Sequence, residues 1–221
     1  MCSLYSLRRT PAETRTLFNY LDQPDFPPRP YVAPGGPMAI VRLEEGQRRF
    51  ALVRWGFIPS WTKEIKPGKP LINARGETVA DKPSFRNAFR RRRCLVPADG
   101  FYEWRGDIPG KKQPFLFRRP DRGLFAFAGL WEHWAGVDGA ELETGLIITT
   151  GPNRVAAPIH DRMPVIIAPE DHETWLSGEP GAALSLIRPA PDDFLIAEET
   201  RIERVAPVRP VAPAGGQGSL L

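Results

Sequence analysis

Short apolar runs rich in β-branched and aromatic residues recur along the chain, and glycine, proline or aspartate separates them. Such runs are typical of β-strands, because these side chains pack well on a pleated sheet and the separating residues favour turns. The pattern predicts strands over residues 38–43, 50–57, 93–98, 114–118, 124–132, 145–150 and 163–168.

Helical signals are fewer, and they fall in residues 10–21, 82–92 and 168–178. The first segment has Thr10 as a candidate N-cap and Pro11 at the first helical position. The second places Phe85 and Phe89 four positions apart, on one helix face. Strands outnumber helices and do not alternate with them, so a parallel βαβ sheet is not expected. We predict one α+β domain with a curved, β-barrel-like mixed or antiparallel core and peripheral helices.

The length of 221 residues suits one sizeable domain, which we place at residues 1–204. Residues 205–221 have the proline, glycine and alanine bias of an extended tail. No apolar stretch reaches the roughly 18 residues of a membrane span, and no signal-peptide pattern is present. We therefore expect a cytoplasmic protein with no membrane association.

The chain has two cysteines, Cys2 and Cys94, which is too few for a disulfide framework. Cys94 lies among apolar strand formers and is predicted to be a small buried hydrophobe. The three histidines show no metal-ligand spacing with the cysteines. We expect no metal and no cofactor.

The net charge of +4 and a pI near 9.3 favour a polyanionic partner. Much of the excess is arginine in the stretch FRNAFRRRRC. Arginine suits bidentate phosphate contacts, but the same run also fits a solvated helix face.

Polar residues stand out among the apolar runs in four places. Asn73 and Arg75 lie two positions apart in PLINARGET, on one face if the segment is extended. Glu103 lies in PADGFYEW, His160 precedes an apolar run in APIHDRMPVII, and Trp61 ends VRWGFIPSW. Each also has a structural interpretation as a satisfied pair, a turn residue or a core aromatic. Composition alone therefore indicates only an α+β domain with a candidate Cys/His/Glu/Asn site.

Several stretches in a fixed order extend this interpretation: MC at the start, INARGET, FRNAFRRRRCLVPADGFYEW, FAFAGLWE and APIHDRMPVII. From Cys2 to about Ile167 the chain closely resembles the SOS response-associated peptidase-like (SRAP) family, the abasic-site processing proteins. The resemblance implies a compact α+β domain with a β-barrel-like core and a basic DNA groove. It also implies a protein of the DNA damage response that crosslinks covalently to abasic sites in single-stranded DNA, and that is nucleoid-associated when bound.

The resemblance assigns catalytic roles to four matching residues. It implies Cys2 as the nucleophile, Asn73 beside it, Glu103 as acid/base and His160 near the lesion. Two departures affect polar contacts near this site. The start is MCSL where the family commonly has MCGR, so a basic residue is missing, and Tyr31 stands where asparagine is usual.

Single-stranded DNA is expected to lie in a basic groove with one or two aromatic platforms. The resemblance implies that Arg75 contacts a phosphate and makes Trp61 a stacking candidate. Arg162 and members of the run from Arg90 to Arg93 are further candidates. Binding is expected to weaken with salt and to depend little on base identity. Nothing in the sequence requires more than a monomer.

The chemistry explains why the cysteine stands at position two. An amine captures the aldehyde of an abasic sugar reversibly, whereas a neighbouring thiol closes the imine to a five-membered thiazolidine. Within a chain only an N-terminal cysteine offers both groups, so Met1 must be removed. We expect the amine and thiol of Cys2 to have usable nucleophilic fractions at neutral pH.

Neighbouring residues are expected to assist this reaction. Flanking Tyr102 and Trp104 should desolvate Glu103 and raise its pKa, so that it serves as a general acid/base. His160 could hold the 3′ phosphate or move protons, and Asn73 could orient the sugar oxygen. Loss of the 3′ phosphate from the same imine by β-elimination would be lyase activity.

Two alternatives remain open at the level of sequence. Cys2, Glu103 and His160 could form a cysteine peptidase or N-terminal-nucleophile hydrolase, with autocatalytic removal of Met1. The chain could instead be a non-catalytic reader of single-stranded DNA or a modified base, with Cys2 merely packed at the terminus.

Overall fold

Five strands close into a ring in the computed structural model, which describes residues 2–22, 24, 26–65, 68, 70–106 and 112–202. In ring order the strands are β10 (Glu141–Thr150), β4 (Gln47–Trp55), β3 (Pro37–Glu44), β6 (Arg93–Ala98) and β9 (Phe125–Ala135). Pairing of β9 with β10 closes the ring. Its neighbours are antiparallel except β10 and β4, so the predicted barrel-like mixed core is confirmed.

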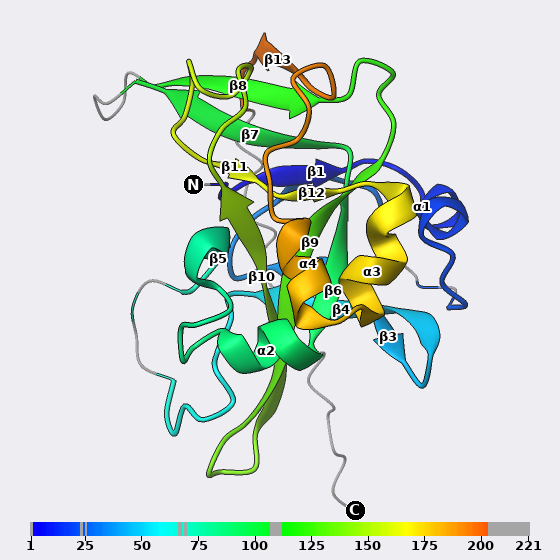
Figure 1. The fold of residues 1–221 in the computed structure, drawn as a ribbon, viewed down its shortest axis with the longest axis vertical. Coiled ribbons are helices and arrows are strands. Elements are labelled where there is room, and N and C mark those ends of the chain that lie inside the picture. Colours follow the sequence, from blue (N-terminus) through cyan, green and yellow to red (C-terminus); the bar gives the residue numbers. More distant parts are fainter. Residues whose placement is uncertain are drawn as a thin grey trace, which may run out of the picture.

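A second sheet covers one end of the barrel, at the top of Figure 1. Its order is β13 (Ile196–Glu199), β8 (Gln113–Arg118), β7 (Gly100–Arg105), β1 (Tyr5–Leu7) and β2 (Arg29–Val32). We call it the outer sheet. Short strands extend the barrel sheet: β5 (Asn73–Arg75) and β11 (Met163–Pro164) pair with β10, and β12 (Ile166–Ile167) pairs with β9.

The helices lie at the periphery, as Figure 1 shows. They are α1 (Pro11–Phe18), α2 (Arg86–Arg91), α3 (His172–Ser177) and α4 (Pro180–Ser185), with 3₁₀ turns η1 (Gly76–Thr78) and η2 (Pro169–Asp171). No helix in the described part of the chain has the length and apolar character needed to cross a bilayer.

The start of α1 is the one predicted from the sequence. Thr10 is the N-cap: its hydroxyl accepts from the Glu13 amide at 3.3 Å, and the Glu13 carboxylate accepts from the Thr10 amide at 2.9 Å. This reciprocal capping box satisfies two amides that the first helical turn leaves without partners. The helix ends at Asn19, which adopts the left-handed conformation with φ of 52°.

Alternation along the barrel strands divides the buried side chains into two cores. On β6, Cys94 and Val96 belong to the core that joins the barrel to the outer sheet. Leu95 faces the other way, into the core beneath helices α1 to α3. Successive strand residues point to opposite faces, so one apolar strand serves both cores. Cys94 is fully buried, which confirms its prediction as a small buried hydrophobe.

Most predicted strands are present, with ends shifted by a few residues. The predicted strand 163–168 is two short strands that pair with different partners. Sequence analysis missed five strands and one helix: β1, β2, β5, β7, β13 and α4. Most of these are short or mix polar with apolar residues, so their period is weak. The predicted tail, residues 205–221, and the domain limit at residue 204 lie outside the described residues.

Candidate functional site

Cys2 lies just before β1 and is buried, with 1% of its surface exposed. The Tyr102 amide donates to the Leu4 carbonyl at 2.9 Å, which continues the β1–β7 pairing towards the start of the chain. The Cys2 thiol faces the Leu4 carbonyl, with 3.8 Å between sulfur and oxygen. Strand pairing therefore places Cys2 alongside the part of β7 that carries Glu103.

Asn73 holds Cys2 from the barrel side. It begins β5, which runs parallel to β10, so Asn73 and Arg75 share one strand face as expected. The Asn73 Nδ2 group donates to the Cys2 carbonyl at 2.8 Å. Its Oδ1 atom is buried and has no hydrogen-bond partner among the described residues. Asn73 thus fixes the backbone of Cys2, and its Oδ1 atom remains able to accept a hydrogen bond.

Glu103 and His160 face each other, with 3.7 Å between Glu103 Oε2 and His160 Nε2. The Glu103 side chain is 3% exposed, and burial raises its pKa to about 7. The direction agrees with the sequence analysis, but the expected cause is wrong. Tyr102 and Trp104 are its neighbours on a strand, so they point to the opposite face. Phe115 on β8, which pairs with Glu103, shares its face.

His160 lies in the loop before β11, and a backbone amide of this loop binds its ring. Its Nδ1 lies 3.0 Å from the Arg162 amide nitrogen and 3.1 Å from Asp161 Oδ1, which turns Nε2 towards Glu103. Burial lowers the pKa of His160. The ring is therefore neutral at pH 7, beside a carboxyl that is near its midpoint of titration.

The Cys2 thiol differs from the expectation of a usable thiolate at neutral pH. Burial raises the pKa of this thiol well above its ordinary range, and the negative charge of Glu103 adds to the effect. Both cysteines are free and buried in the structure. The resting thiol is consequently protonated.

The three predicted DNA-binding residues have different surroundings. Arg75 is exposed on β5. Arg162 is 15% exposed and forms a bidentate ion pair with Glu77, at 2.6 and 2.8 Å, while also donating to the Thr149 carbonyl at 2.7 Å. Sequence reasoning missed Glu77 and Thr149; the polar end of GLIITT was the available signal for the threonine.

Trp61 is 62% exposed in the loop after β4, whereas Trp55 is fully buried and donates to the Ile72 carbonyl at 2.9 Å. The loop that carries Trp61 also lines an open cleft of about 210 Å³ with Phe57 and Leu71. The Trp61 ring therefore offers an exposed aromatic surface to a partner.

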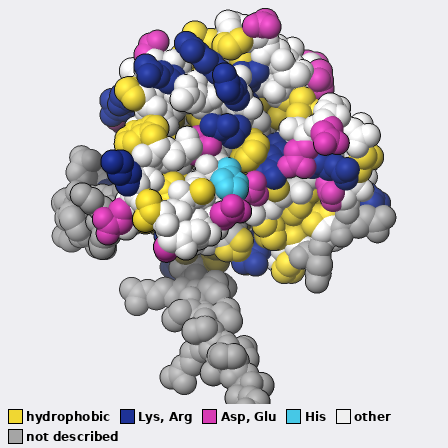
Figure 2. All heavy atoms as spheres, turned by 90° about the horizontal axis from the view of Figure 1, so that it is seen from below, with side chains coloured by type: hydrophobic (Ala, Val, Ile, Leu, Met, Phe, Trp, Pro, Cys, Tyr) yellow, Lys and Arg dark blue, Asp and Glu magenta, His cyan; other side chains and the backbone are white. Residues whose placement is uncertain are grey.

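The arginine run separates into two pairs. Arg90 and Arg91 on α2 are exposed, in keeping with a solvated face. Arg92 pairs with Glu132 at 2.7 Å, and Arg93 is buried and donates to the Phe89 carbonyl at 2.7 Å. Figure 2 views the molecule from below, and on the face it shows, basic side chains gather on one part of the surface with acidic side chains beside them.

The Tyr31 ring lies 5.6 Å from the Tyr102 ring, centroid to centroid. In the ranges that the structure describes, no three histidine, cysteine, aspartate or glutamate side chains gather in a way that could hold a metal ion.

Comparisons with known proteins match nearly the whole chain. A family model described as SOS response associated peptidase (SRAP) matches residues 1–206. The abasic site processing protein YoqW of Bacillus subtilis is 39% identical over 203 residues, covering 89% of this chain and 91% of that protein. YobE of the same organism, also an abasic site processing protein, is 38% identical over 203 residues, covering 89% and 93%. A crystal structure of a protein from Bacteroides thetaiotaomicron matches with a TM-score of 0.79 and 25% identity, covering 90% of this chain and 92% of that one.

Proposed function

The chain belongs to the SOS response associated peptidase (SRAP) family, and we propose that it processes abasic sites in DNA by bonding to them covalently through Cys2. One observation supports this most directly. Asn73 binds the Cys2 carbonyl at 2.8 Å, and the nearby Glu103, with a pKa of about 7, faces His160. A buried acid/base beside an N-terminal cysteine suits carbonyl capture.

The proposed reaction starts once Met1 has been removed, because only then does Cys2 have a free α-amine. The amine nitrogen attacks the aldehyde carbon of the ring-opened sugar and forms a carbinolamine. This intermediate loses water to give an imine. The thiol then adds across the C=N bond, with sulfur bonding to carbon and the proton going to nitrogen. The product is a thiazolidine, and one water molecule is released overall.

Glu103 supplies the proton transfers in this scheme. With a pKa of about 7, it is present in both protonation states at neutral pH. The acid form can protonate the departing hydroxyl group, and the carboxylate can accept the thiol proton as sulfur adds. His160, whose pKa is lowered, accepts a hydrogen bond or relays the proton.

The raised pKa of the Cys2 thiol supports one order for the two bonds. A protonated thiol is a poor first nucleophile, whereas the imine carbon is a strong electrophile held next to it. We therefore place the amine first and the thiol second. The same property disfavours the cysteine-peptidase alternative, which relies on a thiolate with a lowered pKa.

Single-stranded DNA is the proposed substrate because the nucleophile is buried. A sugar must leave the base stack to reach Cys2, and this costs least where no complementary strand pairs with its neighbours. The exposed side chains of Arg75 and Trp61 would contact the phosphate backbone and a flanking base.

The test mixes the purified protein with single-stranded DNA that bears one abasic site. The expected product is a heat-stable adduct on a denaturing gel. Its intact mass should equal the Met1-free chain plus the DNA, less one water. Cys2→Ser should form no stable adduct, while the matched variant Cys94→Ser should form it at the wild-type rate.

A DNA control isolates the aldehyde. A strand with a tetrahydrofuran abasic analogue cannot open to an aldehyde and should give no adduct. If the DNA strand is cleaved at the lesion and no adduct forms, the activity is that of a lyase, and the crosslinking proposal is contradicted. Cleavage of peptides by the wild type, lost in Cys2→Ser, would favour the peptidase alternative and contradict the proposal.

A further inference from the structure

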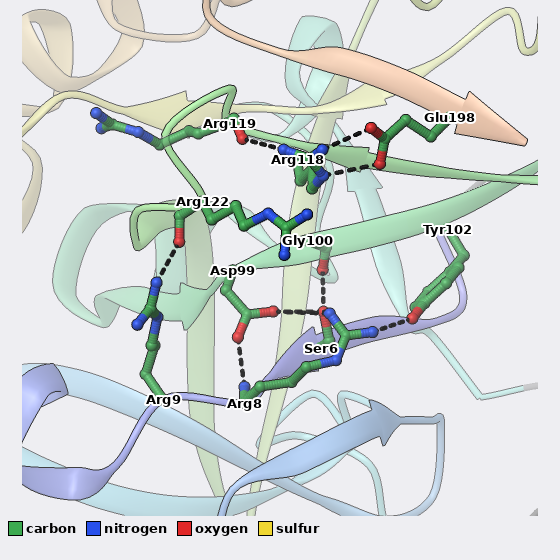
Figure 3. A network of polar contacts seen from close by, with 10 residues as sticks. All are labelled: Ser6, Arg8, Arg9, Asp99, Gly100, Tyr102, Arg118, Arg119, Arg122 and Glu198. Carbon is green, nitrogen blue, oxygen red and sulfur yellow. Dashed lines mark hydrogen bonds and ion pairs between the residues drawn. The ribbon is translucent and has the colours of Figure 1, made fainter. Parts of the chain in front are cut away.

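A hollow of about 420 Å³ lies on the face of the outer sheet that is opposite to Glu103. Strand alternation puts Tyr102 and Leu116, which pair across β7 and β8, on this opposite face. Its walls are Arg8, Arg9, Asp99, Leu116, Arg118, Arg122 and Glu198. Figure 3 shows most of these side chains around the hollow. We call it the arginine hollow.

The two carboxylates of the arginine hollow are already satisfied. Asp99 accepts from the Ser6 hydroxyl at 2.6 Å and from the Arg8 amide, and Arg8 also donates to the Tyr102 hydroxyl at 2.6 Å. Glu198 is bound by the Arg118 guanidinium, with Nε to Oε2 at 2.8 Å. Neither carboxylate therefore needs a further donor.

Positive charge remains in excess. Arg9 forms an ion pair at 3.1 Å with Glu13, which also accepts from the Thr10 amide. Arg9 also donates to the Arg122 carbonyl at 2.7 Å. Among the described residues, the Arg122 guanidinium has no hydrogen-bond or ion-pair partner, and Figure 3 shows it pointing into the hollow towards Gly100. One arginine is thus aimed inward without an anion, and the exposed parts of Arg8 and Arg9 flank it.

We propose that the arginine hollow is a binding site for phosphate groups, separate from the Cys2 site. Planar guanidinium groups match phosphate oxygens through paired N–H donors. The hollow has room for a diphosphate, and Leu116 is the one apolar residue of its lining. The phosphate comes either from a small phosphorylated molecule or from a nucleic-acid backbone, and both present the same oxygens.

The test titrates the full chain with pyrophosphate at low salt, followed by calorimetry. Arg122→Asn is the informative variant, because Arg122 has φ of 57° and asparagine tolerates this left-handed backbone. Its carbonyl, which binds Arg9, is kept. We expect Arg122→Asn to weaken pyrophosphate binding about tenfold or more, in line with the loss of charge-assisted hydrogen bonds. Arg15→Gln on α1 removes one charge elsewhere and should leave binding unchanged.

A second arm identifies the source of the phosphate. Undamaged single-stranded DNA is added to the pyrophosphate complex. If this DNA displaces pyrophosphate from the wild type and binds Arg122→Asn more weakly, the hollow binds a nucleic-acid backbone. Pyrophosphate binding that this DNA leaves unchanged assigns it to small phosphorylated molecules. Absence of pyrophosphate binding, or equal binding by wild type and Arg122→Asn, would overturn the proposal. Crosslinking through Cys2 is measured separately with the same variants, so the two proposals can fail independently.

Discussion

Asp99 and Glu103 lie four positions apart, and both carboxylates are nearly removed from solvent, yet their surroundings differ. Asp99 is 8% exposed and accepts from the Ser6 hydroxyl and the Arg8 amide on the arginine side of the outer sheet. Glu103 is 2% exposed on the Cys2 side, where burial raises its pKa to about 7.

The difference shows how two acidic residues of one short stretch of chain come to have different properties. A buried carboxylate with donors on both oxygens stabilises the fold, because its hydrogen bonds offset the cost of desolvation. A buried carboxyl whose pKa approaches neutrality exchanges protons readily and suits catalysis. Sequence neighbours can therefore serve stability on one face and chemistry on the other.

The largest effect should follow from removing the proton exchange at Glu103. Glu103→Gln keeps the size of the side chain but cannot give or take a proton at neutral pH. We expect the rate of adduct formation with abasic single-stranded DNA at pH 7 to fall about 100-fold. Glu141→Gln, at an exposed position on β10, is the control. If Glu103→Gln crosslinks at the wild-type rate, Glu103 has no catalytic role, and the proposed difference in function between Glu103 and Asp99 is wrong.

The same variant should change how stability depends on pH. The folded pKa of Glu103 is about 7 against an ordinary value of 4.5, so the folded state binds more protons between these values. The free energy of unfolding of the wild type therefore falls as pH rises from about 4.5 to 7. Relative to the wild type, Glu103→Gln should gain up to about 3 kcal/mol over this range. Urea unfolding at pH 4 and pH 8 measures it, and a constant difference would contradict the raised pKa.

Removing the charge of Asp99 should cost stability. Asp99→Asn replaces an oxygen that accepts by an NH₂ group, which leaves either the Ser6 hydroxyl or the Arg8 amide poorly satisfied. We expect the free energy of unfolding to drop by about 2 kcal/mol. The exposed variant Asp81→Asn should change it little, and an equally small change in Asp99→Asn would contradict its structural role.

The smallest effect is expected at the rim of the arginine hollow. Glu198 is 46% exposed and pairs with Arg118. Glu198→Gln should lower the free energy of unfolding by less than about 1 kcal/mol, and added salt should reduce the difference further. Thermal unfolding at two ionic strengths tests this, and a salt-independent loss of several kcal/mol would place Glu198 with Asp99 instead.

The fold was predictable where a local signal agreed with burial. The runs at 93–98 and 145–150 are apolar throughout, and both are barrel strands. Thr10 and Glu13 lie within one turn, so the start of α1 could be identified. Strand β7 was missed because its buried glutamate makes sense only after β1 and β8 are paired with it.

The candidate site was predictable as a set of residues but not as an arrangement. Asn73 and Cys2 are 71 positions apart, and no periodicity shows that one binds the carbonyl of the other. Arg162 forms its ion pair with Glu77, which is 85 positions away in the sequence. Arg91 and Arg92 are chemically identical, yet only the fold decides which of them faces Glu132.

A single residue, Asp99, separates β6 of the barrel from β7 of the outer sheet. This junction leaves no linker at which the barrel and the outer sheet could be separated, and separation would expose the apolar core that the two layers share. We expect the protein to resist truncation into a smaller working fragment, and to melt in one cooperative transition.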